Sequence, residues 1–247
     1  MATRSPRPSA VVTDIDGTLT DRERRLDLGA IRTIRALIDR KVPVVLATGN
    51  VLPIALALYR SLGLSGPIVA ENGGVIYRKA GGKETVKILT DRSVALAAYR
   101  HLEREGFDVE PLFTDRWRES EVALRPTVRA SELEKALTGF PVVVEDTGYA
   151  VHLMSRGGGK LPALRRALRP LGLTPGDCVV AGDGDNDVPM LSAAGFAISF
   201  PSGSERARAA ADYVAKARYA RGFVEGIMVS GVLHASKPVR KGRNAGR

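Results

Sequence analysis

The stretch SAVVTDIDGTLTDRE, residues 9–23, decides how the rest of this 247-residue sequence can be interpreted. An apolar run from Ala10 to Val12 leads into Asp14 and Asp16, and a glycine follows directly. Side chains two apart on an extended chain point to the same side, so we expect both carboxylates at one spot beyond a buried strand. Close like charges repel and push one carboxyl group toward protonation, so the pair requires a physical explanation.

Short apolar runs alternate with amphipathic stretches in the first 75 residues. Strands are expected over residues 10–14, 42–48 and 66–74. Helices are expected over 27–40 and 49–63, with Asn50 as the N-cap of the second helix. Short buried strands separated by helices are typical of an α/β fold, in which helices cover both faces of a Rossmann-like parallel sheet.

The pattern changes between residues 80 and 156, where the order helix–strand–strand occurs twice. The expected helices and strands are 91–106, 108–113, 119–125, 130–139, 142–146 and 149–155. This order predicts a small α+β cap with an antiparallel sheet, bordered by glycine clusters near Lys79 and Arg156. The parallel pattern resumes after residue 160. We therefore predict a discontinuous core over 1–79 and 157–234, a cap over 80–156 and a basic tail over 235–247.

Four polar clusters follow predicted strands or begin a predicted helix. They are Asp14/Asp16, Thr48-Gly49-Asn50, Lys160, and the run from Asp183 to Asp187. Ligands of open parallel sheets bind at the carboxyl ends of the strands, so these clusters are expected to meet.

Two familiar motifs can be excluded. The run GDGDND resembles the start of a calcium-binding EF-hand loop, but Val188 and Ala194 replace the required glycine and glutamate. The run RGGGKL lacks the pattern of a nucleotide-binding P-loop, because Leu161 follows the lysine where the motif requires Ser or Thr.

Together, the four clusters could bind a cation and a phosphate group. Asp14, Asp16 and Asp183 would gather negative charge in one pocket, and oxygen-only ligands favour Mg²⁺. Lys160 and Thr48 would supply a charge and a hydroxyl donor to phosphate oxygens. The backbone N–H groups after Asp16 could add further donors.

Four motifs occur in this order along the sequence: DIDGT, ATGN, a lysine that opens a helix, and GDGDND. The order is typical of the haloacid dehalogenase-like phosphohydrolase superfamily, which the sequence resembles over residues 10–230. The glycine-bounded insert is similar to the cap of its Cof-type branch. The sequence most resembles archaeal-type phosphoglycolate phosphatases in three features: the short cap, the segment VAENGGVIY and the segment GDGDNDVPMLSAAGFAIS. One departure is Leu161, where relatives often have glycine after the lysine.

The resemblance implies a role for each matching residue. Asp14 would be the nucleophile that forms an aspartyl-phosphate, and Asp16 the general acid and base. Mg²⁺ would bind Asp14, the backbone carbonyl of Asp16 and Asp183, and Asp187 would ligate the ion or orient a metal-bound water. The residues expected to hold phosphate or substrate are Thr48, Gly49, Asn50, Lys160 and Asn186. For Asn186 and Asn72, a purely structural role in a turn remains the alternative.

The predicted function is that of a magnesium-dependent phosphomonoester hydrolase, with 2-phosphoglycolate as the leading substrate. The alternatives are a sugar- or polyol-phosphate phosphatase, a phosphomutase and a basic nucleic-acid-binding protein. Three cap cations, Arg116, Arg118 and Arg125, could bind a substrate carboxylate, whereas His152 is expected to be structural.

Composition sets the remaining expectations. The net charge is +10, but seven of these charges lie in residues 1–9 and 235–247, so nucleic-acid binding would involve the basic tail alone.

The apolar runs are too short to span a membrane, and the lone Cys178 cannot form an internal disulfide, so a cytoplasmic protein is expected. A homodimer is among the allowed assemblies. The sequence has no glutamine and four asparagines, which favours a thermophilic source.

Overall fold

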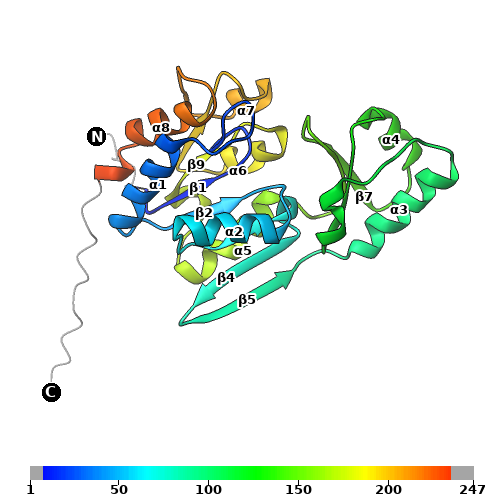
Figure 1. The fold of residues 1–247 in the computed structure, drawn as a ribbon, viewed down its shortest axis with the longest axis horizontal. Coiled ribbons are helices and arrows are strands. Elements are labelled where there is room, and N and C mark those ends of the chain that lie inside the picture. Colours follow the sequence, from blue (N-terminus) through cyan, green and yellow to red (C-terminus); the bar gives the residue numbers. More distant parts are fainter. Residues whose placement is uncertain (1–7, 235–247) are drawn as a thin grey trace.

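The computed structural model describes residues 8–234, which form a large α/β core and a smaller part beside it (Figure 1). The predictions for the basic tail at 235–247, and for Arg4 and Arg7, lie outside the described residues. Among residues 8–234, no helix is long and apolar enough to cross a membrane.

The core is built on one eight-stranded sheet with the order β11-β10-β9-β1-β2-β3-β4-β5. The parallel strands are β1 (Ala10–Thr13), β2 (Val44–Ala47), β3 (Ile68–Ala70), β9 (Cys178–Ala181), β10 (Phe196–Ser199) and β11 (Tyr213–Val214). Two antiparallel strands, β4 (Val75–Ala80) and β5 (Lys83–Ile88), complete one edge. Strand β1 is central and lies between β9 and β2, so residues that follow these three strands become neighbours.

Helices cover both faces of the large sheet, as the α/β prediction requires. One face carries α1 (Leu28–Asp39), α2 (Leu52–Leu62) and α8 (Tyr219–Val229), and the other carries α5 (Lys160–Leu168), α6 (Val188–Ser192) and α7 (Glu205–Ala209). In β1, Val11 packs into the first of these two hydrophobic cores and Val12 into the second. The uninterrupted apolar runs in the sequence therefore reflect strands buried on both faces.

The smaller part has a three-stranded antiparallel sheet with the order β6-β8-β7. Its elements are α3 (Arg92–Arg104), β6 (Glu121–Leu124), α4 (Ala130–Ala136), β7 (Val142–Asp146) and β8 (Val151–Ser155). Side chains such as Leu102, Val122 and Leu153 form a separate hydrophobic core between the helices and this sheet. We call residues 92–155 the cap. Short 3₁₀ helices occupy Glu71–Gly73, Phe113–Trp117, Arg169–Leu171, Pro175–Asp177, Asp185–Asp187 and Val232–His234.

Two expectations about this region were wrong. Residues 83–88, expected in the cap, form β5 and extend the core sheet, because Gly81 and Gly82 make a hairpin turn rather than a domain border. Both glycines have positive φ, at 56° and 79°, as a tight two-residue hairpin requires. Residues 108–113 do not form a strand and contribute only an isolated bridge between Pro111 and Leu124. Proline has no N–H to donate to a ladder.

Candidate active site

The polar clusters meet at the carboxyl edge of the central strands. Thr13 of β1 pairs with Ala181 of β9 and Leu46 of β2, so the three strands end at the same level. Asp14 directly follows β1, the Asp183 turn follows β9, and Thr48 follows β2. The sheet register alone therefore brings together residues that are far apart in sequence.

Three carboxylates form the centre of the site. Asp14, Asp183 and Asp187 each place an oxygen within 4.8 Å of the others. The carboxylate of Asp187 accepts hydrogen bonds from the backbone N–H groups of Asp183 (2.9 Å) and Gly184 (3.0 Å), which fixes it inside the turn. Thr18 donates its hydroxyl to Asp183 over 2.8 Å. A metal ion that takes oxygen ligands could bind at this cluster.

Gly17 allows the close approach of the first loop to this cluster. Its φ is +77°, and a Cβ atom there would overlap the Asp183 carboxylate. A glycine is therefore required in the DIDGT motif for two physical reasons: the backbone conformation disfavours side chains, and there is no space for a Cβ atom beside the Asp183 carboxylate.

Lys160 provides the positive charge of the site. It is the first residue of α5, and its buried Nζ donates to Asp14 Oδ1 (2.9 Å) and to Asp187 Oδ1 (2.6 Å). Burial alone would lower the pKa of Lys160, but the two carboxylates outweigh burial and raise the pKa. The lysine is therefore held in its charged form.

One ammonium group does not compensate three carboxylates. Burial raises the pKa of Asp14 well above its ordinary value although Lys160 opposes the shift, and Asp187 and Asp183 raise it further. Burial, followed by the charge of Asp187, raises the pKa of Asp183 to about 7. A divalent cation would relieve this repulsion, so the donor set and its charge fit a metal site.

Asp16 has different surroundings from Asp14. Its Oδ2 accepts a hydrogen bond of 2.6 Å from Asn50 Nδ2, and its carboxylate does not belong to the three-carboxylate cluster. The expectation that Asn50 caps α2 was wrong, since Val51 is the N-cap and no side chain caps that helix. Thr48 accepts a hydrogen bond from the Asn50 N–H over 3.1 Å, which fixes the loop after β2.

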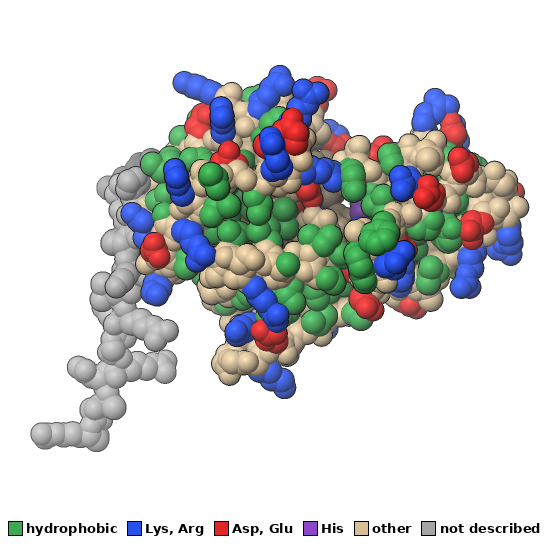
Figure 2. Space-filling view, in the orientation of Figure 1, with side chains coloured by type: hydrophobic (Ala, Val, Ile, Leu, Met, Phe, Trp, Pro, Cys, Tyr) green, Lys and Arg blue, Asp and Glu red, His purple; other side chains and the backbone are tan. Residues whose placement is uncertain are grey.

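A cavity of about 310 Å³ opens over these residues, between the core and the cap. Figure 2 shows the hollow between the two parts. Its core side includes Asp14, Asp16, Thr48, Gly49, Asn50, Asp183, Asn186 and Asp187. Lys160 lies beneath it, in contact with Asp14 and Asp187. The structure therefore gathers all the expected site residues around one cavity.

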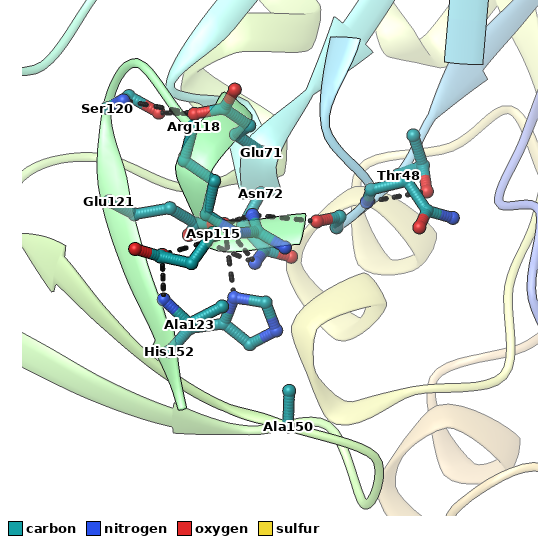
Figure 3. Close-up of polar contacts among 12 residues, drawn as sticks. Thr48, Glu71, Asn72, Asp115, Arg118, Ser120, Glu121, Ala123, Ala150 and His152 are labelled. Atoms are coloured by element: carbon teal, nitrogen blue, oxygen red, sulfur yellow. Dashed lines mark hydrogen bonds and ion pairs between the residues drawn. The ribbon is translucent and has the colours of Figure 1, made fainter. Parts of the chain in front are cut away.

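The cap contributes two buried residues to the cavity, Arg118 and His152. Both contact Glu121 of β6, and Asn72 of the core donates to the same carboxylate over 3.2 Å (Figure 3). Asn72 in turn accepts a hydrogen bond of 3.0 Å from Asn186, in the turn that carries Asp183 and Asp187.

Sequence reasoning did not single out Glu121 and treated His152 as structural. Glu121 and His152 lie on neighbouring cap strands, and β-strand alternation does not say which sheet face will meet the core. Arg116 and Arg125 do not line the cavity, since Arg116 stacks on Phe113 and Arg125 pairs with Glu110 on the cap surface. Only Arg118, among the three expected arginines, faces the site.

The chain matches the family described as haloacid dehalogenase-like hydrolase over residues 11–117 and 123–227. It is 38% identical over 223 residues to a phosphoglycolate phosphatase of Methanoculleus marisnigri, a match that covers 88% of this chain and 94% of that protein. It is 36% identical over 227 residues to a phosphoglycolate phosphatase of Archaeoglobus fulgidus, with coverage of 92% and 99%.

Solved structures agree with the architecture. A crystal structure of a Thermoplasma acidophilum protein superposes with a TM-score of 0.82 at 26% identity and covers 92% of this chain and 100% of that one. A haloacid dehalogenase-like hydrolase of Bacteroides thetaiotaomicron shares the fold, with a TM-score of 0.74, 20% identity and coverage of 90% and 99%. Together with the motifs gathered at the sheet edge, these matches show that the chain belongs to the haloacid dehalogenase-like hydrolase family.

Proposed function

We propose that this protein is a magnesium-dependent phosphatase that hydrolyses 2-phosphoglycolate to glycolate and phosphate through an aspartyl-phosphate on Asp14. One observation carries the proposal: Asp14 is held by Lys160 beside Asp183 and Asp187, at the floor of a cavity roofed by the cap. The relatives named as phosphoglycolate phosphatases support the choice of substrate.

The two aspartates of the first loop divide the chemistry. In the first step, a carboxylate oxygen of Asp14 attacks phosphorus, and the bond between phosphorus and the glycolate oxygen breaks. Asp16 gives its proton to that leaving oxygen. In the second step, Asp16 removes a proton from a water molecule that attacks the phosphorus of the aspartyl-phosphate, and the Asp14 carboxylate is released.

Neighbouring residues prepare Asp14 and Asp16 for these roles. Asn50 holds one oxygen of Asp16, and the other oxygen can carry the proton. Lys160 and the hydroxyl of Thr48 would stabilise the negative charge of the transferring phosphoryl group. The amide of Asn186 and the loop at Gly49 would help to hold the substrate.

Asp14, the backbone carbonyl of Asp16 and Asp183 are the residues that would hold Mg²⁺, and Asp187 would ligate the ion or orient its water. When bound, the ion would supply positive charge that keeps Asp14 ionised and neutralises phosphate oxygens. The raised pKa values of Asp14 and Asp183 are the observation that favours a cation here.

A sugar- or polyol-phosphate phosphatase remains the second candidate. The cavity extends past Arg118 to Thr147 and Tyr149 in the cap, which leaves room for a longer leaving group. A cytoplasmic location, a thermophilic source and a homodimer stay predictions.

A panel of phosphomonoesters tests the proposal. Purified protein with Mg²⁺ is expected to release phosphate from 2-phosphoglycolate with a higher kcat/KM than from sugar phosphates or nucleotides. Asp14→Asn should abolish turnover, whereas Asp39→Asn, an exposed carboxylate on α1, should leave it unchanged. If no phosphomonoester is hydrolysed, the phosphatase function is refuted, and if sugar phosphates rank first, the named substrate is refuted.

A further inference from the structure

We propose that Arg118 and His152 form a receptor for a carboxylate on the leaving group of the substrate, with Glu121 as the positioning residue that holds both. This inference rests on the proposed phosphatase function and deepens it, because it names the chemistry by which the cap would select substrates. The substrate class is that of short phosphorylated hydroxy acids.

Both residues are buried, yet both reach the cavity. Arg118 is 5% exposed and His152 is 3% exposed, and both line the cavity that contains Asp14 and Asp16. Figure 3 shows their side chains extending from the cap toward the core. A buried guanidinium is costly unless its donors are satisfied, so any donor of Arg118 that Glu121 and Asp115 leave without a partner favours an anionic ligand in the cavity.

Each of the two side chains has a nitrogen without a hydrogen-bond partner among residues 8–234. Nη1 of Arg118 donates to the Gly49 carbonyl (3.1 Å) and contacts Glu121, and Nε is buried 3.9 Å from Asp115 Oδ1, but within residues 8–234 Nη2 has no hydrogen-bond partner. Nδ1 of His152 lies 3.0 Å from Glu121 Oε1, and Nε2 has no partner among the same residues. A protonated imidazole donates from both nitrogens, so the ring can bridge Glu121 and a substrate carboxylate.

Glu121 fixes the directions of these donors. It is 1% exposed and contacts Arg118, His152 and Asn72 together. Burial would raise the pKa of Glu121, but His152 and Arg118 outweigh burial and lower the pKa, which keeps the carboxylate charged. A charged Glu121 holds the guanidinium and the imidazole in place and leaves their outer donors for a ligand.

The position of Arg118 limits the length of the substrate. Its contact with Gly49 places it beside the loop that carries Thr48 and Asn50, where phosphate is expected. In 2-phosphoglycolate a single methylene group separates the carboxylate from the leaving oxygen, so its receptor must adjoin that loop. The other arginines of the cavity, Arg22 and Arg24, are exposed, and Arg24 stacks over Tyr149 at 3.6 Å, so they suit longer ligands.

A matched pair of substrates tests the receptor. The pair is 2-phosphoglycolate and 2-hydroxyethyl phosphate, in which a CH₂OH group replaces the carboxylate, and the readout is the ratio of their kcat/KM values. Arg118→Met and His152→Gln should each lower this ratio by about 10- to 150-fold, the effect of one lost hydrogen bond to a charged group. Arg125→Met, which removes an exposed cap cation, should leave the ratio within about twofold of wild type.

The possible outcomes distinguish failure of the proposed carboxylate receptor from failure of the proposed phosphatase function. An unchanged ratio, or an equal loss on both substrates, would overturn the receptor. Wild-type protein that hydrolyses both substrates without preferring the acid would also overturn it, but would leave the phosphatase function standing. Wild-type protein that hydrolyses no phosphomonoester would refute the function itself.

Two further measurements keep the proposal testable if Arg118→Met fails to fold. Glycolate should inhibit wild-type hydrolysis of p-nitrophenyl phosphate at least about 10-fold more tightly than ethylene glycol, since only glycolate carries a carboxylate. In addition, Arg118→Lys keeps a charge beside Glu121 but cannot contact Glu121 and the substrate carboxylate through separate nitrogens, so it should still lower the ratio. Equal inhibition by the two compounds would overturn the receptor.

The role of Glu121 is tested by a double-mutant cycle. Glu121→Gln should lower the same ratio, and adding Glu121→Gln to Arg118→Met should change it little further, because the two residues act as one unit. Additive effects, or a Glu121→Gln variant with a lower Tm and an unchanged ratio, would show that Glu121 is only structural.

Discussion

Asp14 and Asp16 lie two positions apart, but their neighbours give them different properties. Asp14 contacts Lys160 and lies in the three-carboxylate cluster, whereas Asp16 is hydrogen bonded to an uncharged amide, that of Asn50. The repulsion expected between the two aspartates is thus reduced, because each has its own partner.

Asp16→Asn tests this division of roles. The general acid is not needed for a good leaving group such as p-nitrophenolate, but the general base is needed to activate water. We therefore expect a burst of p-nitrophenol of about one equivalent, trapped phosphoenzyme in acid-quenched samples, and a steady-state rate that is about 100- to 10,000-fold lower. Asp14→Asn/Asp16→Asn should show no burst. A steady-state rate at the wild-type level would contradict the role of Asp16.

The pKa of Asp183 predicts how stability depends on pH. Its value is about 7 in the folded protein, against 3.8 for an ordinary aspartate, so the folded state binds more protons than the unfolded chain between about pH 4 and pH 7. Stability without metal should fall as the pH rises through this range, and Asp14 acts in the same direction.

We expect the Tm of EDTA-treated protein to be several degrees lower near pH 8 than near pH 5, and Mg²⁺ to raise the Tm more at the higher pH. Asp183→Asn should weaken both effects, and Asp39→Asn should not. A Tm of the metal-free protein that rises over this range would show that Asp183 does not titrate as stated.

At the scale of elements, the turns after the strands position the site. The 3₁₀ turn Glu71–Gly73 after β3 packs directly against the start of α5, where Lys160 lies. Gly73 has a φ of +100°, and a Cβ atom there would overlap the Gly159 carbonyl. The placement of Lys160 therefore depends on a glycine almost 90 residues earlier in the chain.

Gly73→Ala should displace the start of α5 and with it Lys160. We expect a lower Tm and a kcat at least about 10-fold lower, because a displacement of about 1 Å in a catalytic group can cost 100-fold. Gly139→Ala is the matched control: its φ is +95° and the added Cβ would meet no atom within 4 Å. The control should lower the Tm through backbone strain alone and leave kcat unchanged. Equal kcat values for the two variants would rule out the displacement of Lys160.

At the scale of the whole molecule, a few buried polar contacts join the cap to the core. Glu71 of the core accepts hydrogen bonds from the backbone N–H groups of Glu119 and Ser120 (3.0 Å each) and from the Ser120 hydroxyl (2.6 Å). Burial raises the pKa of Glu71 although Ser120 opposes the shift. These bonds lie beside Arg118 and Glu121, so they fix the roof of the cavity.

Glu71→Ala should loosen the cap. Without the acceptor, the buried N–H groups of residues 119 and 120 lose their partner, which costs about 1–3 kcal/mol of stability. We expect faster proteolysis of the connecting segments near residues 89–91 and 156–158, and a lower kcat/KM. Glu119→Ala changes an exposed side chain whose backbone N–H is kept, so it should behave like wild type. Proteolysis at the wild-type rate in Glu71→Ala would show that other contacts hold the cap.

The alternation of buried strands and amphipathic helices could be predicted from the amino-acid sequence, because burial imposes a period that is visible along the chain. The same local pattern predicted that Asp14, Thr48, Lys160 and Asp183 stand at strand or helix ends.

Three features follow instead from the packing of the folded chain. Asn50 holds Asp16 instead of capping α2, Gly81–Gly82 turn a core hairpin, and the cap residues Arg118, His152 and Glu121 gather over the cavity. Each of these depends on contacts between elements that are distant in sequence, and a periodic pattern does not specify which face of one element meets another.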